Sequence, residues 1–458
     1  MDLVSLRELL AAEIKGTAFE GKAYFAGGCV RDHQLGLATN DIDICVELPE
    51  GGIALAKFLA QRFGASEPIV YERFGTALLV WGDIKLEFVM TRTENYRTGN
   101  RNPLVKFGSL LEDIKRRDFT INAMLISISS GELIDLQGRG QKDLSDRMLK
   151  TTDEPEKVFT EDPLRILRGF RFMAGLDLRI DKDVEEAIQS RANILRTLSP
   201  ERISAEFCRL LELEKASSGI RKMQKLGVLS EILPELSALG KLEQNHYHSL
   251  DAFEHTLLVL DKSSFLLPCR WAALLHDLGK RATFSRSGSS PEDTTKTGKI
   301  HFYGHEKVSA EIAEKVLKRF LMNQNTTRQI VWAIRNHMIF KQSGNMAEKI
   351  PDHKLLKLIN EKDTEDLDIL LDLVHSDNLS HHPDHCMPEQ IPALRERIEA
   401  LRRQNLIFPL TGNDIIAYYD ISASSLVGKL LSKAKDYWYK QPDLNKSELL
   451  KMIRKDVR

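Results

Sequence analysis

The chain has 458 residues, which is enough for two to four domains at roughly 100–200 residues each. Apolar residues make up 42% of it, so buried cores can form. Lysine and arginine number 65 against 66 aspartates and glutamates, which leaves a net charge of −1. The chain therefore lacks the overall positive charge that would indicate a nucleic-acid partner, and any RNA contact must come from local basic patches.

The cysteines and the N-terminus indicate a cytoplasmic protein. The five cysteines are far apart and form no Cys-x-x-Cys pair, which argues against a cysteine-type zinc site and against a disulfide framework. Residues 1–16 predict an amphipathic helix and lack the apolar core of a signal peptide. No run approaches the ~18 apolar residues of a membrane span, so we expect no membrane partner.

Residues 1–150 mix strands and helices. Apolar runs predict strands at 23–26, 42–46, 69–71, 77–81 and 84–90, and one helix at 55–63. Residues 92–113 are polar and contain glycine and proline, so they predict a long loop, which is uncommon without a function. Residues 117–126 predict a helix that turns into a strand.

Helical periodicity replaces the strand pattern after about residue 150. It has breaks at Pro200 and Gly227, and a polar excursion at 285–299. The predicted fold class is α+β, with a small mixed-sheet head followed by an all-α body. The predicted domains are a head, a helical nucleobase- and RNA-binding domain, a histidine-containing helical domain and a basic helical tail, at residues 1–150, 151–240, 241–390 and 391–458.

A glycine pair and an aspartate pair lie in the stretch from Tyr24 to Val46. Asp41 and Asp43 alternate on a predicted strand, so their carboxylates face the same way. Such carboxylates repel unless a cation lies between them, and Mg²⁺ prefers carboxylates together with substrate phosphates. Gly27-Gly28 lets the backbone approach phosphate, and Arg31 could pair with a triphosphate. The alternative, for an aspartate pair alone, is a strand with solvated acids.

The first motif, GGCVRD at 27–32 followed by DID at 41–43, resembles that of class II tRNA nucleotidyltransferases and bacterial poly(A) polymerases. The resemblance extends from about residue 20 to 235. It implies nucleotidyl transfer with Asp41 and Asp43 as the catalytic residues that hold Mg²⁺.

A second motif, RRDFTINAM, occupies residues 116–124. In the family this motif holds the ribose and the triphosphate, which implies that role for Arg116, Arg117, Asp118 and Asn122. Asp118 and Asn122 are four residues apart and would share a helix face, where an aspartate accepts from ribose hydroxyls and an asparagine donates and accepts. The alternative is a capped amphipathic helix with surface arginines. Residues 135–143 resemble the family's flexible hinge segment.

A fourth motif places Asp162, Arg165, Arg168 and Arg171 three residues apart, which predicts one polar stripe on a helix. A carboxylate accepts from the exocyclic amine of cytosine or adenine, and a guanidinium donates to the adjacent ring acceptor. Guanine and uracil present a carbonyl instead, a mismatch of about 1–3 kcal/mol. Asp162 and Arg165 could thus select C and A without a template, which is the family's known device. Arg168 and Arg171 would serve phosphates or order the other two. The alternative is a salt-bridged surface.

Twelve of the thirteen histidines lie between His246 and His385. The doublet His276-Asp277, with other histidines and Asp377 on separate predicted helices, resembles the pattern of the HD-domain metal phosphohydrolases. The resemblance implies His255, His276, Asp277 and Asp377 as primary ligands of a divalent transition metal such as Ni²⁺ or Mn²⁺, with His305 and His337 as further ligands or phosphate contacts. A metal-bound water there could attack a phosphoester, and Lys280 could bind phosphate. A purely structural metal, or histidines packed in a core, is the alternative.

The last thirty residues hold nine lysines and arginines against four acids, with Tyr437-Trp438-Tyr439 among them. Basic residues with aromatics suit RNA backbone and stacked bases, and helix packing explains the pattern equally well.

The resemblances imply a CCA-adding enzyme that extends the 3′ end of tRNA from CTP and ATP. An enzyme adding only A or only CC, or a poly(A) polymerase, is a related alternative. The long segment at 92–113 argues against a CC-only enzyme and the HD-type region against a poly(A) polymerase. Two alternatives of other classes are an HD-type phosphatase or phosphodiesterase with an RNA-binding front module, and a non-catalytic RNA-binding protein.

Overall fold

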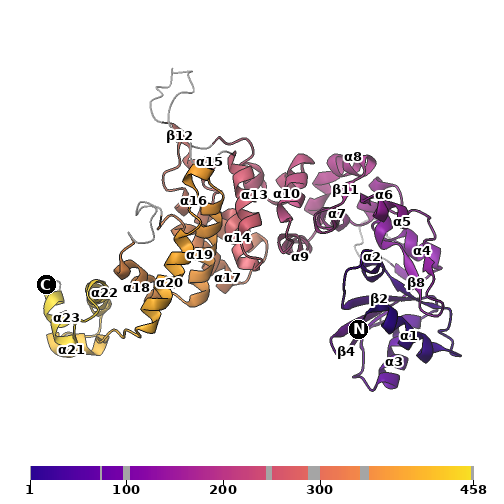
Figure 1. The fold of residues 1–458 in the computed structure, drawn as a ribbon, viewed down its shortest axis with the longest axis horizontal. Helices are drawn as coiled ribbons and strands as arrows, with labels where there is room; N and C mark the ends of the chain where they lie inside the picture. Colours follow the sequence, from indigo (N-terminus) through magenta and orange to yellow (C-terminus); the bar gives the residue numbers. More distant parts are fainter. Residues whose placement is uncertain are drawn as a thin grey trace. The chain divides into compact units, whose positions relative to one another are not determined.

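A computed structural model describes residues 2–72, 75–95, 104–243, 250–286, 300–340 and 350–454. The chain divides into two compact units, residues 1–210 with 218–232 and residues 211–217 with 233–458. The first unit contains the main sheet and the second is almost entirely helical (Figure 1), which confirms the α+β class. The division into four domains stays a prediction.

A seven-stranded sheet with strand order β3-β4-β5-β2-β1-β8-β9 forms the centre of the first unit. Its strands are β1 (Ala23–Ala26), β2 (Asp41–Val46), β3 (Ile69–Tyr71), β4 (Thr76–Trp81), β5 (Ile84–Met90), β8 (Leu125–Ser127) and β9 (Leu133–Ile134). β2 and β5 run parallel, and the other neighbouring strands are antiparallel. The five predicted strands are confirmed to within one residue at each end.

Five helices accompany this sheet: α1 (Leu3–Ile14), α2 (Gly28–Gln34), α3 (Gly51–Phe63), α4 (Leu110–Lys115) and α5 (Gly140–Ser145). α3 begins four residues before its predicted start and packs on β2, β4 and β5. Gly52 permits this packing, because a Cβ there would lie 2.9 Å from the carbonyl oxygen of Gly75.

The predicted loop at 92–113 is wrong at both ends. β6 (Arg92–Asn95) pairs with β7 (Leu104–Phe107) as a hairpin, and a capping box at Ser109 starts α4. Residues 96–103 of the predicted loop lie outside the described residues.

In the prediction for 117–126, the helical part is wrong and the strand at its end is confirmed by β8. The segment forms only the 3₁₀ turn η2 (Thr120–Asn122) before β8. Phe119 has an extended backbone, and the Thr120 amide donates to the Lys150 carbonyl at 2.9 Å, so long-range pairing replaces the helical hydrogen bonds.

Helices dominate the chain from residue 155. They are α6 (Pro155–Glu161), α7 (Leu164–Leu176), α8 (Lys182–Arg191), α9 (Pro200–Leu211), α10 (Ala216–Lys225) and α11 (Val228–Ile232). The predicted breaks hold, because Pro200 begins α9 and Gly227 separates α10 from α11. Strand structure does not end at residue 150, since β10 (Met148–Leu149) pairs with β11 (Arg179–Ile180).

A helical bundle forms the centre of the second unit. The mutually packed helices are α13 (Ala252–Lys262), α14 (Leu267–Leu275), α16 (His305–Arg319), α17 (Gln324–Asn336) and α19 (Thr364–Leu379). The others are α12 (Pro234–Ser237), α15 (Lys280–Thr283), α18 (Asp352–Glu361), α20 (Gln390–Arg403), α21 (Gly412–Tyr419), α22 (Ser425–Lys440) and α23 (Lys446–Ile453). A two-stranded pair, β12 (Ser285–Arg286) with β13 (Ile300–His301), flanks part of the predicted excursion, whose residues 287–299 are not among those described.

The tail aromatics belong to a core. Trp438 and Tyr439 are buried, and the Trp438 ring packs edge-on against Phe408 at 5.5 Å. These two rings therefore do not offer faces for base stacking. Within the described segments, no helix combines the length and apolarity that crossing a membrane requires.

Candidate nucleotide and metal sites

β2 carries the aspartate pair as predicted from its alternation. Ile42 and Ile44 are buried, whereas Asp41 is exposed and Asp43 is half-buried on the opposite side of the strand. The parallel register of β2 and β5 sets Glu87 beside Asp43, which adds a third carboxylate to this face. Burial, followed by the charges of Glu87 and Asp41, raises the pKa of Asp43 to about 6 against the opposing effect of nearby arginines. A divalent cation would favour the ionised form.

Gly27 brings the second motif close to the aspartates. Its φ of 72° lies in the left-handed region, and a Cβ there would lie 3.2 Å from both Nη1 of Arg117 and Oδ2 of Asp43. Gly28 follows as the first residue of α2. The absence of a side chain at Gly27 therefore leaves room for the Arg117 guanidinium and the Asp43 carboxylate. The glycine pair would also let phosphate approach the backbone.

The motif prediction missed Asp113, a buried carboxylate that holds two predicted arginines. Its Oδ2 accepts from Nε and Nη2 of Arg117 at 3.2 and 3.0 Å, and its Oδ1 accepts from Nε and Nη2 of Arg116 at 3.0 and 2.5 Å. Burial opposes ionisation, but the two guanidiniums outweigh it and hold the pKa of Asp113 below its usual range.

Hydrogen bonds join three of the predicted motifs. Nη1 of Arg31 donates to Oδ1 of Asn122 at 2.7 Å, and Nδ2 of Asn122 donates to Oδ1 of Asp118 at 3.1 Å. Oδ2 of Asp118 accepts from Nε of Arg168 at 2.7 Å. The structure thus brings these four residues together, through a 3₁₀ turn and not through the α-helix that the spacing predicts.

The predicted polar stripe of the fourth motif is wrong. Asp162 precedes α7 with an extended backbone, and its carboxylate accepts from Nη2 of Arg202 at 2.8 and 3.0 Å. Arg165 is buried, and its guanidinium donates to the carbonyl oxygens of Arg116 and Val158 at 2.6 and 3.3 Å. The two side chains therefore engage different partners, and base reading by them stays a prediction.

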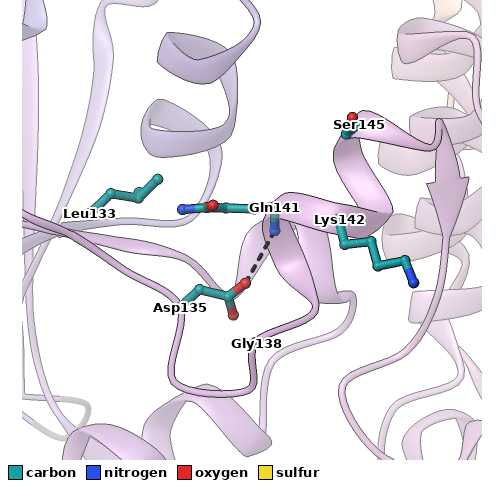
Figure 2. Close-up of a pocket in the computed structure, with 6 residues that line it drawn as sticks. All are labelled: Leu133, Asp135, Gly138, Gln141, Lys142 and Ser145. Atoms are coloured by element: carbon teal, nitrogen blue, oxygen red, sulfur yellow. Dashed lines mark hydrogen bonds between the residues drawn. The ribbon is translucent and has the colours of Figure 1, made fainter.

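The segment predicted to be a hinge lines a pocket of about 510 Å³. Figure 2 shows Asp135 turned toward α5, where its Oδ2 accepts from the backbone amide of Gln141 at 3.2 Å. The lining residues are Leu133, Asp135, Gly138, Gln141, Lys142 and Ser145, none of which belongs to the predicted nucleotide or metal sites.

Six predicted metal ligands meet in the bundle of the second unit, on or next to α13, α14, α16, α17 and α19. All six are buried. Potential ligand atoms lie within 4.8 Å of one another in each of two groups, His255 with His276 and Asp377, and Asp277 with His305 and His337. Their role as ligands stays a prediction.

The imidazole tautomers of this cluster fit a metal. Nδ1 of His276, His305 and His337 each donates to a carbonyl oxygen three residues earlier, at 2.8, 2.8 and 2.6 Å. The lone pair then lies on Nε2. Nε2 of His276 lies 3.1 Å from Oδ2 of Asp277, and Nε2 of His305 faces Nε2 of His337 at 3.3 Å. Burial lowers the pKa of His255 to about 4, so this ring is neutral, as metal ligands must be.

Two further side chains touch this cluster. Lys280 is buried, and its Nζ lies 2.6 Å from Oδ2 of Asp277, so its predicted phosphate contact competes with an ion pair. His381, which the sequence did not single out, places Nε2 3.4 Å from Oδ1 of Asp377 and stacks on the His255 ring at 6.2 Å.

Three family models match successive parts of the chain. They describe a poly A polymerase head domain over residues 23–150, a probable RNA- and SrmB-binding site of polymerase A over residues 177–239, and an HD domain over residues 246–374. These matches define a nucleotidyltransferase of the poly(A) polymerase head type with an HD domain. Both the head and the HD domain imply dependence on divalent metal ions.

Curated relatives narrow this class. An A-adding tRNA nucleotidyltransferase of Deinococcus radiodurans is 33% identical over 333 residues, 70% of each chain. A CCA-adding enzyme of Bacillus velezensis is 35% identical over 264 residues, 56% of this chain and 61% of the relative. The chain therefore belongs to the tRNA nucleotidyltransferase family, in its bacterial class II form with an HD domain.

The fold agrees with this membership. The Bacillus stearothermophilus CCA-adding enzyme in complex with CTP matches the whole chain and 98% of its own, with a TM-score of 0.68 and 22% identity.

Proposed function

We propose that this protein adds C, C and A to the 3′ end of tRNA from CTP and ATP without a template. The observation that carries the proposal is the hydrogen-bonded set Arg31, Asn122, Asp118 and Arg168 in the unit that also carries the Asp41 and Asp43 carboxylates. The relatives named as A-adding and CCA-adding enzymes support tRNA as the acceptor.

In the proposed reaction, the terminal 3′ oxygen of tRNA forms a bond to the α-phosphorus of the nucleotide. The bond from that phosphorus to the bridging oxygen breaks, and pyrophosphate leaves. Asp41 and Asp43, with Glu87 beside them, would hold Mg²⁺, which activates the hydroxyl and stabilises the leaving group. Orientation of the nucleotide is the task of the remaining residues.

The proposed nucleotide contacts follow the geometry. Asp118 and Asn122 would receive the ribose, and Arg31, Arg116 and Arg117 would neutralise the triphosphate. Selection by Asp162 and Arg165 requires that Asp162 exchange the guanidinium of Arg202 for the exocyclic amine of cytosine or adenine.

The test is the incubation of tRNA lacking its CCA end with labelled CTP and ATP. We expect three nucleotides to be added by the wild type and none by Asp41→Ala/Asp43→Ala. A wild type that adds nothing would refute the proposed function, and activity in the double variant would refute the metal assignment alone.

The choice between complete and partial addition needs separate acceptors. A CCA-adding enzyme extends both a tRNA that ends in CC and a tRNA that lacks all three nucleotides. An A-only enzyme extends only the first, and a CC-only enzyme extends only the second, with CTP.

We propose a second, accessory activity for the buried cluster of the second unit, metal-dependent hydrolysis of phosphoesters. His255, His276 and Asp377 would hold one divalent ion such as Ni²⁺ or Mn²⁺, and Asp277, His305 and His337 a second. Bound metal supplies an activated water to attack phosphorus. Hydrolysis of a 2′,3′-cyclic phosphate that persists in His276→Ala would contradict this assignment.

A further inference from the structure

Three arginines lie around the aromatic ring of Phe172 on α7. The guanidinium carbons of Arg171, Arg31 and Arg168 lie 4.4, 5.1 and 5.3 Å from its centroid. The ring is 6% exposed and meets Phe119 edge-on at 5.9 Å and 84°, so the orientation of both of its faces is fixed.

Three guanidiniums in one place repel one another, and two features of the structure oppose that repulsion. Each guanidinium pairs with one acid, Arg31 with Asp32, Arg168 with Asp118 and Arg171 with Glu206. The negative faces of the aromatic ring attract all three, because a ring quadrupole draws cations within about 6 Å of its centroid. An aliphatic side chain would fill the same volume without this attraction.

The acids leave part of the cationic surface available. Arg168 and Arg171 each pair with their acid through Nε, so the terminal Nη groups are not engaged by these carboxylates. A guanidinium stacked on a ring keeps its N–H groups in its own plane, where they can donate to phosphate oxygens. Arg31 and Arg168 are also the two ends of the hydrogen-bonded set through Asn122 and Asp118.

We propose that Phe172 is a positioning residue that holds Arg31, Arg168 and Arg171 together as a preformed receptor for the polyphosphate of the incoming nucleotide. The inference rests on the proposed function and assigns the triphosphate end of that site. The ring touches the arginines and not the reacting atoms. Its removal therefore weakens polyphosphate binding most, and it affects recognition of the nucleoside less, because Asp118 and Asn122 remain hydrogen-bonded to each other.

The experiment measures binding of CTP, cytidine and inorganic tripolyphosphate to the full chain by calorimetry. We expect Phe172→Leu to weaken binding of CTP and tripolyphosphate by about tenfold, and binding of cytidine by no more than about twofold. Phe172→Tyr keeps the aromatic face and should stay within about twofold of wild type. Phe170→Leu is the matched control, because this neighbour on α7 is also buried and none of these three arginines stacks on it.

The outcomes separate the two proposals. The receptor is refuted if Phe172→Leu binds tripolyphosphate like wild type, if Phe172→Tyr loses as much as Phe172→Leu, or if wild type binds no tripolyphosphate. Wild type that binds tripolyphosphate and adds no nucleotide to tRNA refutes only the proposed function. If Phe172→Leu does not fold, the unbranched Phe172→Met tests the same loss of the ring.

Discussion

At the scale of single residues, Asp113 is the carboxylate on which both arginines of the second motif depend. We predict that Asp113→Asn lowers the free energy of unfolding by about 3 kcal/mol, because it leaves two partly buried guanidiniums without a charged partner. Since the pKa of Asp113 is lowered, this stabilisation is complete above the ordinary carboxyl pKa of about 4 and disappears as the pH falls through the lowered value.

Urea unfolding at pH 7 measures this loss. Asp153→Asn is the control, because the Asp153–Lys157 pair at 2.6 Å is partly exposed and contributes about 0–1 kcal/mol. Equal losses in the two variants would contradict the role assigned to Asp113.

Glu87 gives a second prediction at this scale. Without its charge beside Asp43, the aspartate pair should bind Mg²⁺ more weakly. We expect Glu87→Gln to raise the Mg²⁺ concentration for half-maximal nucleotide addition by about tenfold. Asp83→Asn, which removes an acid from the exposed turn between β4 and β5, should leave the Mg²⁺ dependence unchanged. An equal shift of the Mg²⁺ dependence in both variants would show that the effect comes from net charge and not from the position of Glu87.

Single residues differ in how far the sequence predicts them. Asp41 and Asp43 could be found because alternation along one strand is local. Asp113 carried a usable signal, since it lies four residues before Arg117. Glu87 carried none, because the register between two parallel strands is set by the folded sheet and not by either strand alone.

At the scale of elements, the turn between β1 and α2 tests the close approach at Gly27. Gly27 and Gly36 have similar left-handed φ angles of 72° and 69°, but only at Gly27 would a Cβ meet other atoms within 4 Å. Alanine at either position should lower the free energy of unfolding by about 1–2 kcal/mol. We expect only Gly27→Ala to reduce kcat for nucleotide addition, because it displaces Asp43 or Arg117, and equal kcat values in the two variants would contradict this.

Elements formed by local patterns were predicted well, and elements formed by distant partners were not. Five of the seven strands of the sheet agree because short apolar runs determine them, with alternation in β2 and β5 and a continuous run in β1. The hairpin of β6 and β7 was read as a loop, since its polar sequence gives no apolar alternation. The helical part of the prediction at 117–126 fails because residues near 150 take its backbone hydrogen bonds, whereas the strand at its end agrees with β8.

At the scale of the whole molecule, the two candidate metal centres lie in different compact units, and their chemistry should separate. We predict that His276→Ala loses its bound transition metal and its phosphoesterase activity, and that it keeps Mg²⁺-dependent CCA addition. Asp41→Ala/Asp43→Ala should show the reverse. Metal content by mass spectrometry and the two activity assays check this, and loss of both activities in either variant would contradict independent centres.

The ion pair between Asp162 and Arg202 would make nucleotide selection an exchange reaction if Asp162 reads the base. The exocyclic amine of cytosine or adenine would replace a guanidinium, whereas guanine and uracil place a carbonyl at that position and the carboxylate would return to Arg202. Every nucleotide would then compete for Asp162 with Arg202, which belongs to the same chain and is therefore present at a fixed effective concentration. The protein would thus bind the correct nucleotide more weakly, and in return the Asp162 carboxylate would stay paired with Arg202 when a wrong nucleotide enters.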